Sequence, residues 1–402
     1  MNRLRALAVA CMLVPTLAHA GNNTSTLPAN TFIVDTAYYD TRTRIRWDDT
    51  RTARPLLDGI DRYEPGGGLQ GTITANPLVK YQLFVPQLQY GLTDDLTLVL
   101  AMPTVIKSAI QPRLGWIPGD YQNNLGRSYT EDDFWQWAKS MGQNKPGDWQ
   151  GNEWKLADMV VGGRYSLSHL NFFHEHELNA AVSAQVALPT GSNPDPEELV
   201  AAGTTVWDLH NYGDFEVHFA LEKPWKWEEF TRINFGVDLY YGWMRERTFT
   251  TSTGINSPLL MTFAPYVGAT YKIDPGDMIG GTVLVEGVPF VGPTLSTWMN
   301  QHDPEKSKKW PGLLTLTAAV TYAHLNQTTW SSQSALWNWD HEKLWLPGDK
   351  NTIKFNADLS LMRLGLPLML YAGYRTQEWI PGRNSRATDV LMLGGRIILK
   401  FW

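Results

Sequence analysis

The stretch TIKFNADLSL, residues 352–361, decides the fold, because its side chains alternate strictly between apolar and polar. In an extended strand, Phe355 and Leu359 lie on one face while Lys354 and Asp358 lie on the other. A strand with one apolar and one polar face suits the wall of a membrane β-barrel, and it also suits a soluble β-sandwich.

The same alternation recurs in segments 158–167, 178–188, 214–222 and 232–243. Such runs of about 10 residues or more are close to a tilted membrane strand and exceed the five or six residues usual in soluble sheets. Connections also alternate between short and long, which is typical of bacterial outer-membrane barrels. The short turns are Thr93-Asp94-Asp95, 224–229, Asp274-Pro275-Gly276 and 363–366, and the long outer loops are 48–77, 107–155, 190–212 and 293–311.

The composition of the 402 residues agrees with a barrel: 43% are hydrophobic and only 18% are charged, yet the mean hydropathy is −0.28. No run of 18 apolar residues occurs, which excludes a bundle of transmembrane helices. The 18 Trp, 16 Tyr and 14 Phe residues exclude a disordered chain. The sequence therefore predicts an all-β protein, a transmembrane antiparallel β-barrel with long extracellular loops.

We count fourteen strands, with twelve as the alternative, because the first and the eleventh alternate poorly. Strand 79–92 changes face near Pro86, which predicts a bulge or an edge-like defect there. The fourteen segments are 31–46, 79–92, 95–107, 156–170, 176–189, 213–223, 230–244, 258–272, 277–291, 312–324, 327–340, 351–362, 366–379 and 388–402.

Residues 1–20 have the form of a secretory signal peptide, with Arg3 and Arg5 before a short apolar region and a cleavage site at 18–20. The barrel then comprises 21–402, of which 21–78 are partly a plug or the first strand and loop. Cys11, the only cysteine, would be removed, which excludes disulfides and thiol chemistry. Cleavage takes the net charge from −6 to −8, which argues against a nucleic-acid partner.

The chain ends in Phe401-Trp402, which resembles the C-terminal aromatic signal that the barrel-assembly machinery reads in bacterial outer-membrane proteins. Counting back by twos puts Phe401 on the lipid face with Leu399 and Ile397. We therefore expect the outer membrane of a Gram-negative cell, with its lipids and lipopolysaccharide, as the location, and the assembly machinery as a partner.

Several segments resemble the outer-membrane proteins named for a putative MetA pathway of phenol degradation, which are related to barrels that transport hydrophobic compounds. The resemblance is in the order of four motifs: YGLTDDLTLVLAMPTV (90–105), LADMVVGGRYSL (156–167), VALPTGSNPD (186–195) and YGDFEVHFALEKPW (212–225). It covers roughly 90–250 and, more loosely, the last strands. It implies a barrel that passes hydrophobic or aromatic compounds, and it supplies no catalytic residues.

The densest group of potential metal ligands is His174-Glu175-His176-Glu177, at a predicted periplasmic turn. On a strand the two histidines share one face and the two glutamates the other, so the four do not converge, and we expect ordinary solvated charges. No metalloprotease, serine-hydrolase or P-loop motif occurs. The sequence therefore predicts no enzyme, no metal and no cofactor.

The charges on the polar faces of the strands are expected to line the lumen. Both signs occur, so the interior is no single-sign ion filter. The charges either close the lumen through salt bridges or line a wet channel, and closure is the simpler interpretation for any one of them. The set is Arg164, Asp214, Glu216, Glu222, Arg232, Asp238, Glu286, Lys354, Asp358, Arg375, Arg396 and Lys400.

Two loops carry many aromatic side chains. Thr130 and Asp133 resemble a capping box before a short helix, 131–141. Tryptophans at strand ends, such as Trp243 and Trp379, suit an interfacial girdle. Those in mid-loop are expected to pack a mouth over the barrel and to offer a ligand an apolar surface. The predicted mouth residues are Trp116, Phe134, Trp135, Trp137, Trp149, Trp337 and Trp339.

The sequence thus predicts a channel for passive uptake of small hydrophobic or aromatic compounds. Pro86, Pro103, Pro265 and Pro289 fall within expected strands, where lost ladder bonds could open a lateral gap. An export or assembly pore is the second hypothesis, although residues 21–78 lack the coiled coil that such barrels carry. A closed structural barrel is the third.

Overall fold

The computed structural model describes residues 24–56, 59–64, 66–122, 126–140, 145, 147–151, 154–191, 214–227, 231–250, 270–274, 276–288, 314–326, 329–332, 347–361 and 366–400. The strands are β1 (Thr31–Trp47), β2 (Ala53–Pro55), β3 (Ile60–Tyr63), β4 (Leu69–Ala75), β5 (Leu78–Thr93), β6 (Leu96–Ala101), β7 (Thr104–Gln111), β8 (Leu114–Pro118), β9 (Trp149–Gly151), β10 (Lys155–Leu156), β11 (Met159–Ser166), β12 (Asn179–Leu188), β13 (Phe215–Trp227), β14 (Thr231–Trp243), β15 (Arg247–Thr250), β16 (Thr270–Asp274), β17 (Met278–Val288), β18 (Leu314–Leu325), β19 (Thr329–Ser332), β20 (Gly348–Ser360), β21 (Leu368–Thr376) and β22 (Ser385–Lys400). The helices are α1 (Glu131–Ser140) and α2 (Asn171–Glu175).

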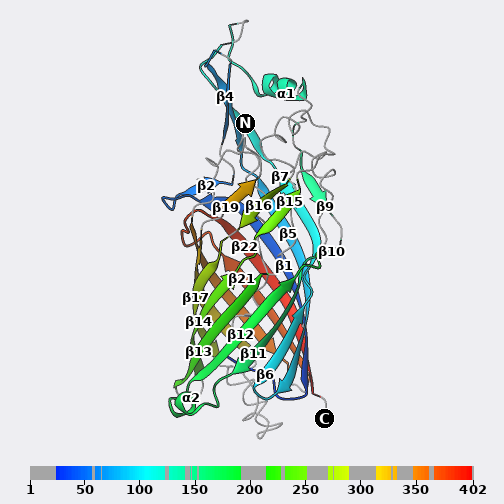
Figure 1. Cartoon of the computed structure of the whole chain (residues 1–402), viewed down its shortest axis with the longest axis vertical. Coiled ribbons are helices and arrows are strands. Elements are labelled where there is room, and N and C mark those ends of the chain that lie inside the picture. Colours follow the sequence, from blue (N-terminus) through cyan, green and yellow to red (C-terminus); the bar gives the residue numbers. More distant parts are fainter. Residues whose placement is uncertain are drawn as a thin grey trace, which may run out of the picture.

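Twelve antiparallel strands close into a barrel, which confirms the predicted fold class (Figure 1). The order is β1, β5, β6, β11, β12, β13, β14, β17, β18, β20, β21 and β22. Closure is made by β1, which pairs with β22 from Thr31 to Trp47 on one side and with β5 on the other. Both edges of the sheet are thereby satisfied, as a membrane-spanning sheet requires.

The structure corrects the preferred count of fourteen strands to the alternative of twelve. Segments 258–272 and 327–340 are predicted to span the membrane. Their described parts instead form β16, which pairs with β15 outside the barrel, and β19, which pairs with β16. The poorly alternating segment 31–46 is a barrel strand after all. Alternation fails to separate these cases because a short sheet above the membrane alternates as well as a spanning strand does.

The turn at Asp274-Pro275-Gly276 is also corrected. It joins the outer strand β16 to the outer end of β17, because Met278 pairs with Gly242 near the end of β14. The strands that flank the predicted outer loop 293–311 meet at the other end, where Gly287 pairs with Leu316. That loop itself lies outside the described residues, as does most of 190–212.

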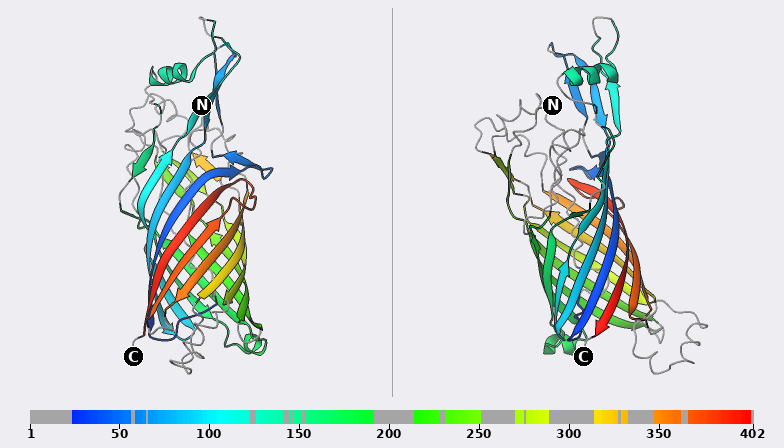
Figure 2. Two further views of the ribbon diagram at one scale, coloured as in Figure 1. Left: turned by 180° about the vertical axis from the view of Figure 1, so that it is seen from behind. Right: turned by 90° about the vertical axis from the view of Figure 1, so that its right-hand side faces the viewer.

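A second small sheet, β3-β4-β8, stands beyond the barrel end with α1 beside it (Figures 1 and 2). Its strands come from the predicted loops 48–77 and 107–155, so these two loops contain regular structure. We call this unit the outer arm. Strands β2, β9 and β10 are short and extend the barrel sheet at the same end.

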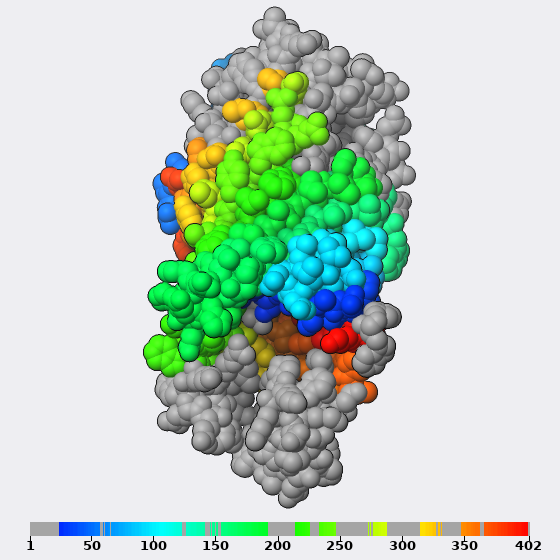
Figure 3. All heavy atoms as spheres, turned by 60° about the horizontal axis from the view of Figure 1, so that its bottom comes forward, coloured from blue at the N-terminus to red at the C-terminus, as the bar shows by residue number. Residues whose placement is uncertain are grey.

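The outer wall of the barrel is apolar. Phe219, Leu239 and Val283 are 37%, 55% and 60% exposed although they lie in the middle of strands, as lipid-facing side chains must be. In Figure 3 the atoms of neighbouring strands form one continuous surface. Trp243 ends β14 and Trp379 follows β21, where it contacts Phe355 and Tyr374, so both lie at strand ends as predicted for a girdle. No helix in the described part of the chain is long and apolar enough to cross a membrane.

The predicted change of face at Pro86 does not occur. Strand β5 keeps one register with β1 from Val79 to Tyr90, so Val85 and Leu83 stay on the inner face. Pro103 does interrupt a strand, since β6 and β7 are separated by Met102-Pro103. Pro265, Pro289, the signal peptide and Phe401-Trp402 lie outside the described residues.

Candidate functional site

The predicted lumen residues that lie on barrel strands occupy inward register positions. Their function as a channel lining stays a prediction. Arg164 lies on β11; Asp214 directly precedes β13, which carries Glu216 and Glu222; Arg232 and Asp238 lie on β14, Glu286 on β17, Lys354 and Asp358 on β20, Arg375 on β21, and Arg396 and Lys400 on β22.

A buried carboxylate joins the two sides of the closing seam. Asp35 on β1 is 1% exposed, and it accepts hydrogen bonds from Arg396 Nε at 2.9 Å and from the Tyr371 hydroxyl at 2.6 Å. The Arg396 guanidinium also lies 5.4 Å from the centre of the Tyr371 ring. These contacts join the neighbouring strands β1, β22 and β21 on the lumen side of the wall, as is expected of a salt bridge that helps to close the lumen.

Acidic side chains gather on the part of the wall formed by β12, β13, β14 and β17. His218 lies 3.2 Å from Asp238 and 3.4 Å from Glu216, and Gln185 donates to Glu216. One strand further on, Asn234 donates to Glu286 at 2.8 Å. Each of these carboxylates has a partner on an adjacent strand or on its own strand, so this side of the lumen is internally paired.

The segment 24–30 crosses the inside of the barrel base before β1 begins. Thr24 is 3% exposed and donates to Glu222 at 2.8 Å, while the carbonyl of Ser25 accepts from Arg164 at 3.1 Å. The N–H of Leu27 donates to the Thr97 hydroxyl at 2.7 Å. The segment therefore lies against lumen side chains, and a function as a plug stays a prediction.

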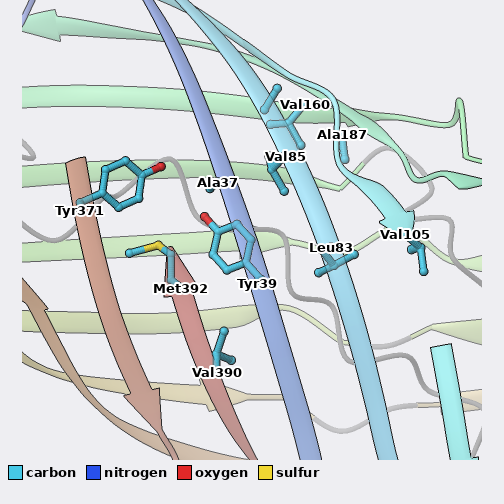
Figure 4. Close-up of a cluster of buried hydrophobic side chains, with 11 residues drawn as sticks. Ala37, Tyr39, Leu83, Val85, Val105, Val160, Ala187, Tyr371, Val390 and Met392 are labelled. Carbon is cyan, nitrogen blue, oxygen red and sulfur yellow. The ribbon is translucent and has the colours of Figure 1, made fainter. Parts of the chain in front are cut away.

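Above this base, part of the inner wall is apolar. Eleven buried side chains from seven barrel strands and β7 form one cluster, and Figure 4 shows them on the inner side of the sheet. Each lies at an inward register position, opposite to the lipid-facing residues of its own strand. We call this set the inner apolar cluster: Ala37, Tyr39, Leu83, Val85, Ala101, Val105, Val160, Ala187, Tyr371, Val390 and Met392.

Four of the predicted mouth residues meet in the outer arm. Phe134 lies 5.7 Å from Trp116, 4.9 Å from Trp135 and 5.7 Å from Trp137 (ring centres), and Arg62 stacks on Trp137 at 3.8 Å. They form the core between α1 and the small sheet, above the barrel rather than at its rim. A short sheet with one helix has no other apolar interior, so stability of the arm accounts for their clustering.

Three predicted mouth residues remain. Trp149 begins β9, which pairs with β7. Trp337 and Trp339 lie outside the described residues. Ligand binding by any of the seven therefore stays a prediction.

The capping box of α1 is confirmed. The Thr130 N–H donates to Asp133 Oδ2 at 2.8 Å, and the Asp133 N–H is 3.3 Å from the Thr130 hydroxyl. Arg127 adds two hydrogen bonds to the same carboxylate, at 2.7 and 2.8 Å. The Arg127 bonds, followed by the Thr130 N–H, hold the pKa of Asp133 far below its ordinary value.

No family model matches the chain, and no curated protein matches it. A solved structure does. The crystal structure of an outer-membrane channel from Pseudomonas putida F1 aligns with a TM-score of 0.51 at 11% sequence identity, over 94% of this chain and 99% of that chain. The two chains share one fold. Together with the apolar outer wall, this fold places the protein in an outer membrane.

Two more distant structures are named for transport of aromatic hydrocarbons. The CymD monoaromatic hydrocarbon channel aligns with a TM-score of 0.33 at 7% identity, over 93% of this chain and 90% of that chain. The toluene transporter TbuX of Ralstonia pickettii aligns with a TM-score of 0.33 at 8% identity, over 94% and 90%. Similarity at that level carries no weight for the function of this barrel.

The His174–Glu177 segment lies at the barrel base, where α2 and the start of β12 form the connection. His176 Nδ1 is 2.7 Å from the Phe172 carbonyl. Within the described residues, no group of three or more His, Cys, Asp or Glu side chains is arranged to hold a metal ion.

Sequence reasoning found the charged lumen positions but missed the inner apolar cluster. The signal was present in the strands that seemed irregular. Strands 31–46 and 79–92 alternate poorly because apolar residues such as Ala37, Tyr39 and Val85 occupy inward positions as well. A spanning strand that is apolar on both faces predicts an apolar patch inside the barrel.

Proposed function

We propose that the barrel is a passive channel through which small hydrophobic or aromatic compounds enter the cell. The inner apolar cluster carries this proposal. An inward surface in an ordinary aqueous pore is polar, whereas here Val85, Val160 and Val390 are 2–3% exposed on the inner side. Because these side chains are packed against one another, an apolar solute uses this surface by moving them apart, and it then gains about 25 cal/mol for each Å² of its own apolar surface that leaves water.

The interruption at Pro103 lies beside this cluster. Ala101, Val105 and Val160 belong to the cluster and flank the break between β6 and β7. Single backbone bonds cross the interruption, from Met102 N–H to the Pro86 carbonyl at 3.0 Å and from Ala157 N–H to the Pro103 carbonyl at 2.8 Å. Few backbone hydrogen bonds hold the strands together at this point, next to an apolar surface. This arrangement supports a lateral exit toward lipid, because a hydrophobic solute prefers lipid to water.

A closed structural barrel is the alternative that the base of the lumen favours. Segment 24–30 and the Asp35–Arg396 pair occupy that end. Single-channel conductance distinguishes both the proposed channel and a closed structural barrel from a wide aqueous pore. The proposed channel gives small or rare ion currents yet passes apolar solutes, whereas a purely structural barrel passes neither.

The proposed test measures entry of the apolar dye N-phenylnaphthylamine into Gram-negative cells with intact lipopolysaccharide. The variant is Val160→Trp, which fills the inner cluster, and the matched control is Val161→Trp, whose side chain points to lipid and is 39% exposed in the native protein. We expect dye entry to depend on the barrel, to fall with Val160→Trp and to persist with Val161→Trp. Equal entry in all three, or none above vector-only cells, refutes the channel.

The finer expectations are proposed together with this function. We propose membership of the MetA-pathway family and a link to degradation of aromatic compounds, on the motifs at 90–105 and 156–167. We propose that lipopolysaccharide phosphates contact Arg42 and Lys80, which face each other across β1 and β5 on the outer wall. We also propose that the assembly machinery binds the strand ending in Phe401-Trp402.

A further inference from the structure

Two hydroxyl groups on the inner face of β1 lie among apolar side chains. Tyr39 belongs to the inner apolar cluster and is 8% exposed, and Thr41, two residues further along the same face, is 0% exposed. The register partners of Tyr39 are Leu83 on β5 and Met392 on β22, which belong to the same cluster (Figure 4). We call Tyr39 and Thr41 the hydroxyl pair.

Neither hydroxyl has a hydrogen-bond partner within the described part of the chain. The Thr41 Oγ1 atom is buried without one, and the Tyr39 hydroxyl makes no hydrogen bond to these residues either. The polar groups on both sides of the pair are satisfied. Further down the same face Asp35 accepts two hydrogen bonds, and further up the Thr43 hydroxyl is 2.9 Å from that of Thr388.

A buried hydroxyl without a partner costs free energy. Phenylalanine and valine, which have nearly the same shapes as tyrosine and threonine, would avoid this cost at the two positions. Thr317, another inner hydroxyl without a partner, has the polar Glu286 as a register partner. The register partners of Thr41 are Tyr81 and Val390. The hydroxyl pair is therefore a polar spot inside an apolar surface, and a group that enters the lumen can supply the missing hydrogen bonds.

The charges near the pair already have partners. Asp35 accepts from Arg396 at 2.9 Å, and Arg375, the register partner of Val390 on β21, has a partner as well. A charged ligand would lose its hydration here without gaining a free counter-charge. An uncharged oxygen needs only a hydroxyl, which both donates and accepts hydrogen bonds.

Met392 provides a part of the cluster that can move. Its side chain lies over Gly373, where an added Cβ would be 2.8 Å from the Met392 Cε atom. An unbranched thioether changes its conformation at little cost and fills irregular spaces. Room for a small ligand can therefore open beside Tyr39 without a change in the barrel strands.

We propose that the hydroxyl pair binds the uncharged oxygen of a small apolar ligand, such as an aromatic alcohol or ketone, whose hydrocarbon body packs against the inner apolar cluster. This assignment of the substrate class rests on the proposed channel function, because the ligand is the solute that enters. Binding at the hydroxyl pair is measurable without transport.

The test compares benzyl alcohol with ethylbenzene, which is of the same size and carries a methyl group in place of the hydroxyl. The protein is held in nanodiscs, and Kd is obtained by ligand-detected NMR titration after subtraction of the signal from empty nanodiscs. In Tyr39→Phe/Thr41→Val we expect the benzyl alcohol Kd to rise about fivefold or more, the size of one lost hydrogen bond. The ethylbenzene Kd should not rise, because the apolar surface is kept.

The matched control is Tyr38→Phe, which removes a tyrosine hydroxyl from the lipid-facing side of the same strand, where Tyr38 pairs with the 47% exposed Leu393. Both Kd values should stay unchanged in this variant. Because the hydroxyl pair has no hydrogen bond to lose, the double variant should also resist urea at least as well as the native protein. The two single variants are measured as well, and at least one of them must show the rise; they serve if heat-modifiable migration on gels shows that the double variant is not folded.

The proposal is overturned if the native protein does not bind benzyl alcohol, if the benzyl alcohol Kd is the same in the native protein and the variants of the pair, or if the Kd values of both compounds rise together. Benzyl alcohol binding that depends on the hydroxyl pair, in a protein that admits no apolar dye to cells, refutes the channel and leaves the site standing. Dye entry through the barrel with an unchanged benzyl alcohol Kd leaves the channel standing and refutes the site.

Discussion

Replacing Asp35 by Ala is expected to destabilise the barrel by about 3 kcal/mol or more. The carboxylate is 1% exposed and accepts from Arg396 at 2.9 Å and from Tyr371 at 2.6 Å. Its loss leaves the Arg396 side chain, 17% exposed, inside the lumen without this carboxylate. Removing one partner of a buried pair typically costs about 3–5 kcal/mol, because the other charge stays desolvated.

The assay is a urea titration of the protein folded in lipid vesicles, followed by tryptophan emission. The control is Asp40→Ala on the same strand: Asp40 is also 2.8 Å from an arginine, but that side chain, Arg42, is 59% exposed, and such pairs contribute about 0–1 kcal/mol. Asp35→Leu/Arg396→Met should recover much of the loss, since no charge then stays buried. The reasoning is refuted if Asp35→Ala costs no more than Asp40→Ala.

Two further predictions concern the base of the lumen and the outer arm. A Cβ at Gly91 would lie 2.1 Å from the Pro28 carbonyl oxygen, so Gly91→Ala should displace segment 24–30 and raise single-channel conductance. The control is Gly163→Ala, where the nearest atom to the added Cβ is at 3.5 Å and the conductance should not change. Equal conductance of the two variants would exclude the segment as a barrier. The lowered pKa of Asp133 means that its stabilisation of α1 is present above the ordinary Asp value near pH 3.9 and is lost as the pH falls below it. Amide hydrogen exchange across 131–140 should therefore be faster at pH 3, relative to the intrinsic rate. The acceleration should be smaller in Asp133→Asn, which already lacks the charge. The prediction is contradicted if the native protein and Asp133→Asn show the same acceleration.

Alternation predicted most of the twelve barrel strands, because lipid on one side and a polar lumen on the other impose a period of two. It could not show how far a strand lies from the membrane. The short β16 and β19 alternate like spanning strands, and counting them as spanning places the turn at 274–276 at the wrong end of the barrel. The pairing of Gly242 with Met278, which is known only from the folded structure, shows at which end of the barrel the turn at 274–276 lies.

The charged residues of the candidate site could be predicted from the sequence, but its apolar residues could not. Residues such as Asp238 and Glu216 are recognisable because a charge in a spanning strand has to avoid lipid. The inner face of β1 and β5 gives no such contrast, since Tyr39 and Val85 are as apolar as their lipid-facing neighbours.

The two halves of the lumen impose opposite conditions on a solute. At the base, Thr24, Ser25 and Leu27 contact side chains of the inner wall, and the charged groups there have partners. A polar solute that follows the axis must break these contacts without replacement. A solute on the inner apolar cluster meets the interruption at Pro103 before it reaches the base. For the proposed channel, the expected route of an apolar molecule is therefore sideways into lipid rather than downward, and uptake by this route would not need a wet, open pore.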